Sequence, residues 1–205
     1  MKFGIWLILL LTLSLNLNAQ CILDDNVTVD IPPAGGIYQP GQTITFTYTI
    51  NTYQGLSINW LHGIVPILGP GWDLTSLAPV GLPTNVTNTG VWLWATNITS
   101  SATGFIVPGP GWFYDTPSGG PPLDGNPGNN YGDGLTGPWT FQWTVTVGDC
   151  PPGNNGDDLS VVIENYADGE TGSWVNYDCQ FDPNEIFNAT LECCPPIITG
   201  PITHN

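Results

Sequence analysis

The chain has 205 residues, and its 17 acidic side chains are opposed by a single basic one, Lys2, which gives a formal net charge of −16 at pH 7. A chain so poor in cations cannot hold nucleic-acid phosphates by counterion release, and it has no basic patch for anionic lipid. It also has no Arg or Lys clamp for a carboxylate or a phosphate. We therefore expect neither a nucleic acid nor an anionic membrane as a partner.

The rest of the composition indicates a folded, turn-rich domain. Hydrophobic residues make up 41% of the chain and charged residues only 9%, which is the reverse of a disordered sequence. The sequence contains 26 Gly and 20 Pro, which favour turns, and it is long enough to bury one substantial core. These features predict a single domain over residues 20–194.

Residues 1–19 have the features of a secretory signal peptide. Lys2 supplies a basic start, an apolar run follows, and Ala19 is a small residue at the expected cleavage point. The apolar run is too short for a membrane span. We expect cleavage after Ala19 and a secreted location, extracellular or at the cell surface. A lipid anchor on Cys21 is the alternative, although Gln20 precedes it where the lipoprotein motif has a small residue.

Alternation of apolar or aromatic residues with polar ones predicts β-strands along the exported chain, and no part of it shows sustained helical spacing. The expected strands are residues 27–31, 43–50, 56–60, 91–95, 139–147, 159–164 and 187–191. Strands with one apolar face form antiparallel sheets. We therefore expect an all-β fold, an antiparallel two-sheet sandwich that is immunoglobulin-like or jelly-roll-like, with long Gly/Pro/Asn loops. Pro40 and Gly41 predict a tight turn in which Gly41 adopts a positive φ.

Two segments, residues 64–73 and 106–115, each carry the sequence Gly-Pro-Gly-Trp. Their tryptophans, Trp72 and Trp112, either plug the ends of the sandwich or project as aromatic platforms that stack on sugar rings. Trp92 and Trp94 are further candidates for such a platform. The expected partner is accordingly an extracellular glycan or a protein surface.

Three loops are rich in Asp, Asn and Gly, and they carry oxygen ligands of the kind that bind Ca²⁺. The candidate ligands are Asp124, Asn126, Asp133, Asp157, Asp158, Asp168 and Glu170. Their spacing does not match an EF-hand, and solvated turns are the alternative interpretation. Calcium is the one candidate cofactor.

All five cysteines lie in the exported part of the chain, where disulfides are expected. We expect Cys150 to pair with Cys179, and Cys21 to pair with Cys193 or Cys194, which leaves one cysteine over. A zinc site is the alternative, but no Cys-x-x-Cys spacing occurs.

Residues 195–205 form a tail rich in Pro, with one Gly, and its composition is typical of an interdomain linker. Either this tail is the frayed end of a single module, or the chain is the first module, or a truncated copy, of a longer surface protein.

The segment Pro40–Ile50 resembles an early strand of immunoglobulin-like modules in bacterial surface proteins. Together with Asn59-Trp60-Leu61-His62-Gly63 and Gly137-Pro138-Trp139-Thr140-Phe141, it resembles the N-terminal modules of large secreted surface and adhesion proteins of Bacteroidetes-type bacteria. The resemblance spans most of the exported chain, and it implies no catalytic residues.

The sequence offers little for catalysis. His62 follows an expected strand and is interpreted as structural, and no Gly-x-Ser-x-Gly motif supports a Ser-His-Asp hydrolase. Glu164, Glu170, Glu185 and Glu192 are candidate acids for a glycosidase, but no spacing pairs them. We therefore expect an adhesive or structural module rather than an enzyme. A carbohydrate-binding module is the first alternative, and a glycosidase is the second.

Overall fold

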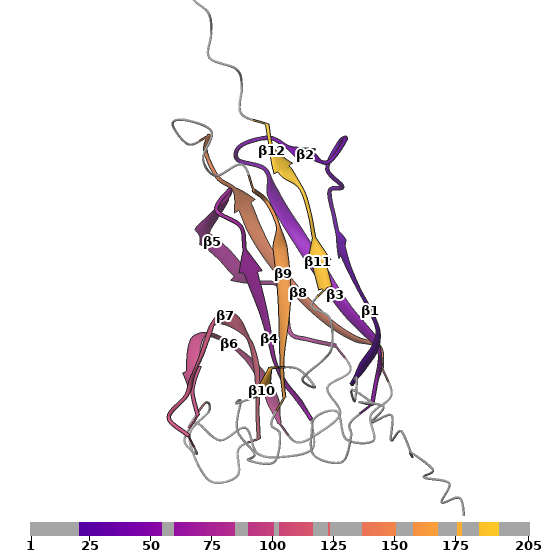
Figure 1. Ribbon diagram of the computed structural model, residues 1–205, viewed down its shortest axis with the longest axis vertical. Coiled ribbons are helices and arrows are strands. Elements are labelled where there is room, and N and C mark those ends of the chain that lie inside the picture. The colour runs from indigo at the N-terminus through magenta and orange to yellow at the C-terminus, as the bar shows by residue number, and fades with distance from the viewer. Residues whose placement is uncertain are drawn as a thin grey trace, which may run out of the picture.

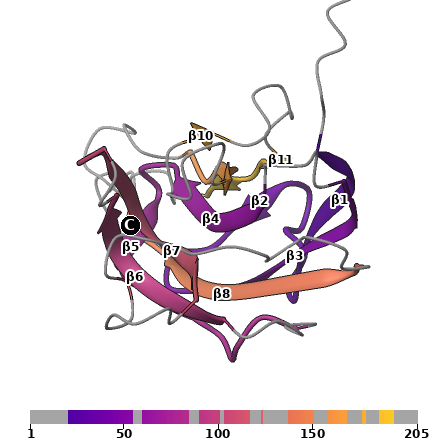
Figure 2. The same ribbon diagram turned by 90° about the horizontal axis from the view of Figure 1, so that it is seen from below.

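The computed structural model describes residues 21–54, 60–84, 90–100, 103–116, 123, 137–150, 158–167, 176–177 and 185–192. Within these ranges the elements are strands, and they form a sandwich of two antiparallel sheets (Figures 1 and 2), as predicted. One sheet has the order β1 (Ile22–Val29), β3 (Thr43–Tyr53), β8 (Trp139–Val147) and β5 (Trp72–Pro79). The other has the order β10 (Asn176–Tyr177), β9 (Val161–Ala167), β4 (Leu61–Leu68), β7 (Ile106–Asp115) and β6 (Val91–Thr99), and β11 (Glu185–Phe187) also pairs with β9. At one end, β2 (Ile37–Tyr38) and β12 (Thr190–Leu191) form a short parallel pair.

The two strands with the strongest alternation lie side by side at the centre of the four-stranded sheet. In β3 the apolar residues face the core and the threonines between them face outward, and β8 alternates in the same way over nine residues. The register places Phe46 opposite Trp143, and their rings stack with centroids 5.8 Å apart. A strand with one apolar face buries that face against a second sheet, and here the second sheet is the six-stranded one.

The turn before β3 also forms as predicted. Gly41 has a φ of 77°, which only glycine adopts without strain. The Gly41 N–H donates to the Val147 carbonyl at 3.0 Å, and the Gln42 N–H donates to the Gln39 carbonyl at 3.3 Å. The turn therefore aligns the start of β3 with the end of β8.

Other elements differ from the predicted ones. β5 and β7 were not expected as strands, and the second Gly-Pro-Gly-Trp sequence lies within β7 rather than in a loop. The segment 187–191 is not one strand, because β11 pairs with β9 and β12 pairs with β2. Of the expected strand 56–60, residues 56–59 lie outside the described ranges, and β4 begins at Leu61.

The six-stranded sheet is apolar on both faces. Its inner face shares the main core with the four-stranded sheet, whereas a second cluster lies on the outer face. In β7, Trp112 and Tyr114 point into the main core, and Phe113 between them points into the second cluster. Leu123 packs against this outer cluster, and its backbone N–H donates to the Asp115 carboxylate. β4 and β7 are consequently buried on both sides, so period-2 alternation is weak in them.

No helix within the described ranges is long and apolar enough to cross a bilayer.

Candidate functional site

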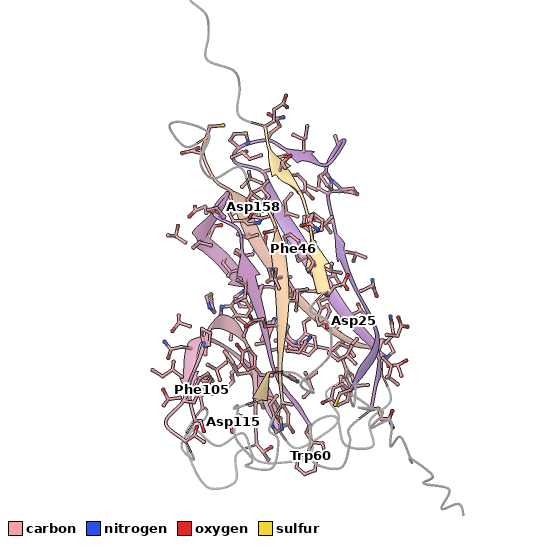
Figure 3. All side chains as sticks on the ribbon, viewed as in Figure 1. Asp25, Phe46, Trp60, Phe105, Asp115 and Asp158 are labelled. Carbon is pink, nitrogen blue, oxygen red and sulfur yellow. The ribbon has the colours of Figure 1, made fainter. Side chains whose placement is uncertain are left out.

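Four polar side chains lie at the side of the sandwich where β1 and β11 meet (Figure 1), and Figure 3 shows the position of one of them, Asp25. One comes from each of β1, β3, β9 and β11, and we call the group the edge cluster: Asp25, Tyr48, Asn165 and Glu185. The sequence places them by alternation. Asp25 precedes Val27 and Val29 on the inward face of β1, and Glu185 precedes Phe187 on the inward face of β11.

Hydrogen bonds connect the cluster across the sandwich. The Asn165 Nδ2 donates to the Tyr48 hydroxyl at 3.3 Å, and that hydroxyl donates to the Asp25 Oδ2 at 2.6 Å. The backbone N–H of Val27 donates to the Glu185 carboxylate. β1 and β3 belong to one sheet and β9 and β11 to the other, so these contacts join the two sheets at an edge where no backbone ladder does.

The electrostatic environment disfavours two charges in this cluster. Burial raises the pKa of Asp25, and the charge of Asp24 raises it further, while the hydrogen bond from Tyr48 acts in the opposite direction. Burial also raises the pKa of Glu185, and the Asp25 charge adds to the effect. Burial and the Asp25 charge together raise the pKa of Tyr48 well above its ordinary value. The phenol therefore stays protonated and acts as the donor to Asp25.

The amide oxygen of Asn165 has no hydrogen-bond partner among the described residues. Asn165 is only 2% exposed, and a buried carbonyl oxygen without a partner carries its full desolvation cost. The contact of this amide group with Tyr48 is made by its nitrogen. The edge cluster thus combines two carboxylates, a phenol and an amide at one edge of the sandwich, and the amide oxygen is buried without a hydrogen-bond partner among the described residues.

Comparison with known proteins gives little further information. No protein-family model matches the sequence, and no curated protein matches it. Among solved structures, the fold is similar to the cohesin module from Clostridium perfringens ATCC13124 family 33 glycoside hydrolase, with a TM-score of 0.36 and 7% sequence identity. The alignment covers 84% of this chain and 98% of that chain.

The tryptophans of the two Gly-Pro-Gly-Trp sequences belong to the core. Trp72 is buried and its Nε1 donates to the Ser160 carbonyl at 3.3 Å. Trp112 is 2% exposed, and its Nε1 donates to the Gln142 carbonyl of the opposite sheet at 3.1 Å. Both indoles thus bury their rings and satisfy their N–H groups inside the sandwich. The hypothesis that they are exposed sugar-binding platforms is wrong.

The two tryptophans of β6 also pack inward. Trp92 is buried, and its ring lies edge-on to Phe141 with centroids 4.8 Å apart. Trp94 is half-buried and meets the Trp112 ring edge-on at 5.4 Å. Trp92 therefore cannot serve as a platform, and Trp94 presents only part of its ring to solvent.

Of the seven predicted calcium ligands, only Asp158 lies within the described residues, and the other six lie outside them: Asp124, Asn126, Asp133, Asp157, Asp168 and Glu170. The Asp158 Oδ1 accepts a hydrogen bond from the Ser160 N–H at 2.8 Å, and its carbonyl accepts one from the Gly71 N–H at 2.9 Å. Both contacts are those of a turn residue. Among the described residues, no three His, Cys, Asp or Glu side chains are grouped as a metal site.

His62 occupies the main core, on β4. Its ring is fully buried and stacks on Tyr114 with centroids 5.6 Å apart and an interplanar angle of 8°. Burial lowers its pKa to about 3, so the imidazole is neutral at physiological pH. This packing is the structural role predicted for His62.

The cysteines do not pair as expected. Cys150 is a free, exposed thiol, which contradicts its pairing with Cys179, and its Sγ lies 3.9 Å from the Glu192 carbonyl oxygen. Cys21 is buried and disulfide-bonded, and Cys179, Cys193 and Cys194 lie outside the described residues.

The position of Cys21 also contradicts its expected partners. Its carbonyl accepts a hydrogen bond from the Gln54 N–H at 2.7 Å, beyond one end of β3. Glu192 donates its N–H to the Tyr38 carbonyl at 2.9 Å, beyond the other end of that 11-residue strand. The strand spans about 36 Å, and Cys194 can lie at most about 8 Å from Glu192 along the chain. A bond from Cys21 to Cys193 or Cys194 is therefore incompatible with this sandwich.

Sequence reasoning did not identify the edge cluster as a site. Glu185 was singled out only as an unpaired acid, and Asp25, Tyr48 and Asn165 were not singled out at all. A usable signal was present, because Asp25 and Tyr48 occupy apolar positions of two alternating strands. A polar residue in an apolar register marks a position whose polar group requires a partner.

Proposed function

We propose that the chain is an exported, disulfide-stapled β-sandwich module of a cell-surface or extracellular protein, with an adhesive or structural role. The observation that carries this proposal is the buried, disulfide-bonded Cys21, the second residue after the signal-like segment. Stable disulfides form in oxidising compartments, so such a bond is consistent with export. The sandwich itself is an architecture common in cell-surface domains.

A protein surface is the partner that we favour. The sugar-stacking interpretation required exposed tryptophans, and three of its four candidates are buried in the core: Trp72, Trp92 and Trp112. Exposed apolar side chains instead occur at the tip of the β6–β7 hairpin, where Phe105 is 39% and Ile106 58% exposed (Figure 3). Adjacent exposed apolar residues of this kind are suited to contact with another protein.

Export is tested by expressing the full chain with its leader in a bacterial host and measuring the mass of the product. We expect an extracytoplasmic protein that begins at Gln20 and in which Cys21 resists alkylation until a reductant is added. A product that keeps residues 1–19 and stays in the cytoplasm would overturn the export part of the proposal.

The adhesive role is tested separately by displaying the mature chain on cells and measuring their retention on immobilised extracellular-matrix proteins. We expect retention to fall when Phe105 and Ile106 are both replaced by Ser, with the melting temperature unchanged. The matched control is Leu82→Ser, because Leu82 is 76% exposed but lies outside the hairpin. Equal loss in the control would show that general surface hydrophobicity, not the hairpin, is responsible.

A further inference from the structure

A hollow of about 270 Å³ lies at the end of the sandwich where β2 and β12 pair (Figure 1). The segment between β1 and β3 gives it an aliphatic side, which includes Ile31, Pro32 and Ile37. Its polar side consists of Gln39, Gln42 and Glu192, the residue that follows β12. Aliphatic surface and a single carboxylate therefore line the same small space.

Hydrogen bonds hold the sides of this hollow in place. The Tyr38 hydroxyl donates to the Ile31 carbonyl at 2.5 Å, and the Glu192 N–H donates to the Tyr38 carbonyl at 2.9 Å. The Gln39 N–H donates to the Gln42 Oε1 at 2.6 Å, and the Gln39 Nε2 donates to the Glu192 Oε2. The position of the carboxylate relative to the aliphatic side is thus fixed before any ligand arrives, which lowers the entropic cost of binding.

The lining excludes several classes of ligand. An anion would meet the Glu192 carboxylate and no cation, because the chain has Lys2 as its single Lys or Arg. A sugar ring or a quaternary ammonium requires an open aromatic face, but Tyr38 is only 1% exposed. Ile31 is 44% and Ile37 38% exposed, so both offer surface to an aliphatic group. The remaining class is a slender aliphatic stem that ends in one positive charge.

We propose that this hollow binds the side chain of a lysine supplied by a partner protein. A lysine has a flexible four-carbon stem that buries itself along apolar surface, and a compact ammonium that acts as a point charge. The stem packs against Ile31 and Ile37, and the ammonium contacts the Glu192 carboxylate. Arginine fits less well, because its planar fork favours both oxygens of a carboxylate and the Gln39 Nε2 already occupies Oε2.

The composition of the chain is complementary to such a ligand. Its formal net charge is −16 at pH 7, which attracts basic partners, and residues 3–205 contain no Lys or Arg that could fill the hollow of a second copy. The inference rests on the proposed function for the source of the lysine, since a contact with another protein supplies it. The shared chemistry is that of a primary alkylammonium, and the experiment separates a protein lysine from a free amine.

The affinity of a single lysine is expected to be weak. Burial of a four-carbon stem together with one exposed ion pair corresponds to a dissociation constant of about 1 mM. Such a contact adds to a larger protein interface and does not replace it. NMR titration measures affinities of this order directly.

The test is a titration of the ¹⁵N-labelled exported chain with Nα-acetyl-lysine N-methylamide, followed by the amide signals of Ile37, Tyr38 and Gln39. We expect saturable shifts, binding about tenfold weaker for the norleucine analogue, which lacks the ammonium, and weaker binding for the arginine analogue. No shift at about 10 mM lysine probe, roughly ten times the expected constant, would overturn the proposal. Equal binding of the norleucine analogue would do so as well. If 1,5-diaminopentane binds more tightly than the lysine probe, the occupant is a free amine and not a protein side chain.

Site-directed variants assign the binding to the hollow. Glu192→Gln keeps an oxygen for the hydrogen bond from Gln39 but removes the charge, and it is expected to weaken lysine binding by about tenfold. Ile37→Thr keeps a β-branched side chain and is expected to weaken it several-fold by reducing the apolar surface. Asp24→Asn is the matched control, because it removes the same net charge from an exposed position on β1 outside the hollow.

Melting temperatures equal to that of the wild type show that the variants are folded. Equal weakening by Glu192→Gln and Asp24→Asn would show that net charge, not the hollow, attracts the probe and would refute the assignment. The outcome is separable from the proposed adhesive role. Loss of lysine binding leaves the retention assay of the Phe105 and Ile106 variants unaffected, and a failed retention assay leaves the titration unaffected.

Discussion

The neutral, buried histidine makes the stability of the fold depend on pH. His62 has a pKa of about 3 in the folded protein, lowered from 6.5 by burial alone. In the unfolded chain the imidazole is exposed and titrates near its ordinary value. As the pH falls through 6.5, His62 of the unfolded chain binds a proton that His62 of the folded protein does not. The stability that the neutral His62 contributes is therefore complete above pH 6.5 and is lost progressively down to pH 3.

The size of this effect follows from the two pKa values. A difference of one pKa unit corresponds to about 1.4 kcal/mol, so the complete effect approaches about 5 kcal/mol at pH 3. Between pH 7 and pH 5 the expected loss is about 2 kcal/mol, a large fraction of the stability of a typical domain. For a domain of this size that loss lowers the melting temperature by about 4–8 °C.

The assay is chemical denaturation of the wild type and of His62→Phe from pH 7 to pH 5. Phenylalanine keeps a planar ring against Tyr114 but cannot bind a proton. The carboxylates are common to both proteins, so their contribution cancels in the difference between the two curves. We expect that difference to change by about 2 kcal/mol across the range. Parallel curves would refute the reasoning. So would a His62 imidazole NMR signal that titrates near 6.5 in the folded protein, identified as the signal of the two histidines that is missing from His62→Phe.

Three further predictions concern packing and covalent structure. Trp112→Ala should lower the free energy of unfolding by about 3–5 kcal/mol, measured by denaturant unfolding, because it opens a cavity between the sheets. Trp94→Ala should lower it clearly less, since Trp94 is only half-buried. Equal losses for the two variants would contradict the difference in burial. Gly111→Ala should destabilise the folded protein by about 1–3 kcal/mol or more, because the new Cβ would lie 2.6 Å from a backbone carbonyl oxygen of β4. A melting temperature within about 1 °C of the wild-type value, as expected for a neutral change, would contradict this close approach. Alkylation of the native protein followed by mass spectrometry should label Cys150 and not Cys21. The peptides should be made with chymotrypsin, because residues 3–205 contain no Lys or Arg for trypsin to cleave after. Labelling of Cys21 without reductant would contradict the disulfide.

The parts of the fold that were predictable are those where one face is buried and the other is solvated. β8 has the predicted bounds, because aromatic and Thr residues alternate along it without interruption. β7 was not predictable by the same rule, since Pro108, Pro110 and two glycines interrupt the pattern and the strand is buried on both faces over its second half. β11 and β12 were merged because the change of sheet between Phe187 and Thr190 depends on distant strands.

The candidate site was less predictable than the fold for a topological reason. Its four residues are separated by as many as 160 positions in the chain, from Asp25 to Glu185, and they meet because β1 and β11 occupy adjacent edges of opposite sheets. Local spacing cannot contain that information. For Trp72 and Trp112 the motif was visible in the sequence, but its interpretation as an exposed platform was wrong. The burial of both rings depends on the distant strands that cover them, which the local Gly-Pro-Gly-Trp spacing does not indicate.

The edge where β1 and β11 meet is where the sandwich depends most on side chains. Within each sheet backbone ladders hold neighbouring strands together, whereas between the two sheets at this edge the described residues are linked by the hydrogen bonds from Asn165 to the Tyr48 hydroxyl and from Val27 to the Glu185 carboxylate. The disulfide of Cys21 fixes the beginning of β1, seven residues or fewer from that contact. The covalent bond of Cys21 thus lies close to the contacts that join β1 to the opposite sheet. β1 is therefore held against the opposite sheet by a few side-chain contacts rather than by a backbone ladder, so loss of the Asn165–Tyr48 or Val27–Glu185 contact should loosen this strand before the ladder that β1 forms with β3.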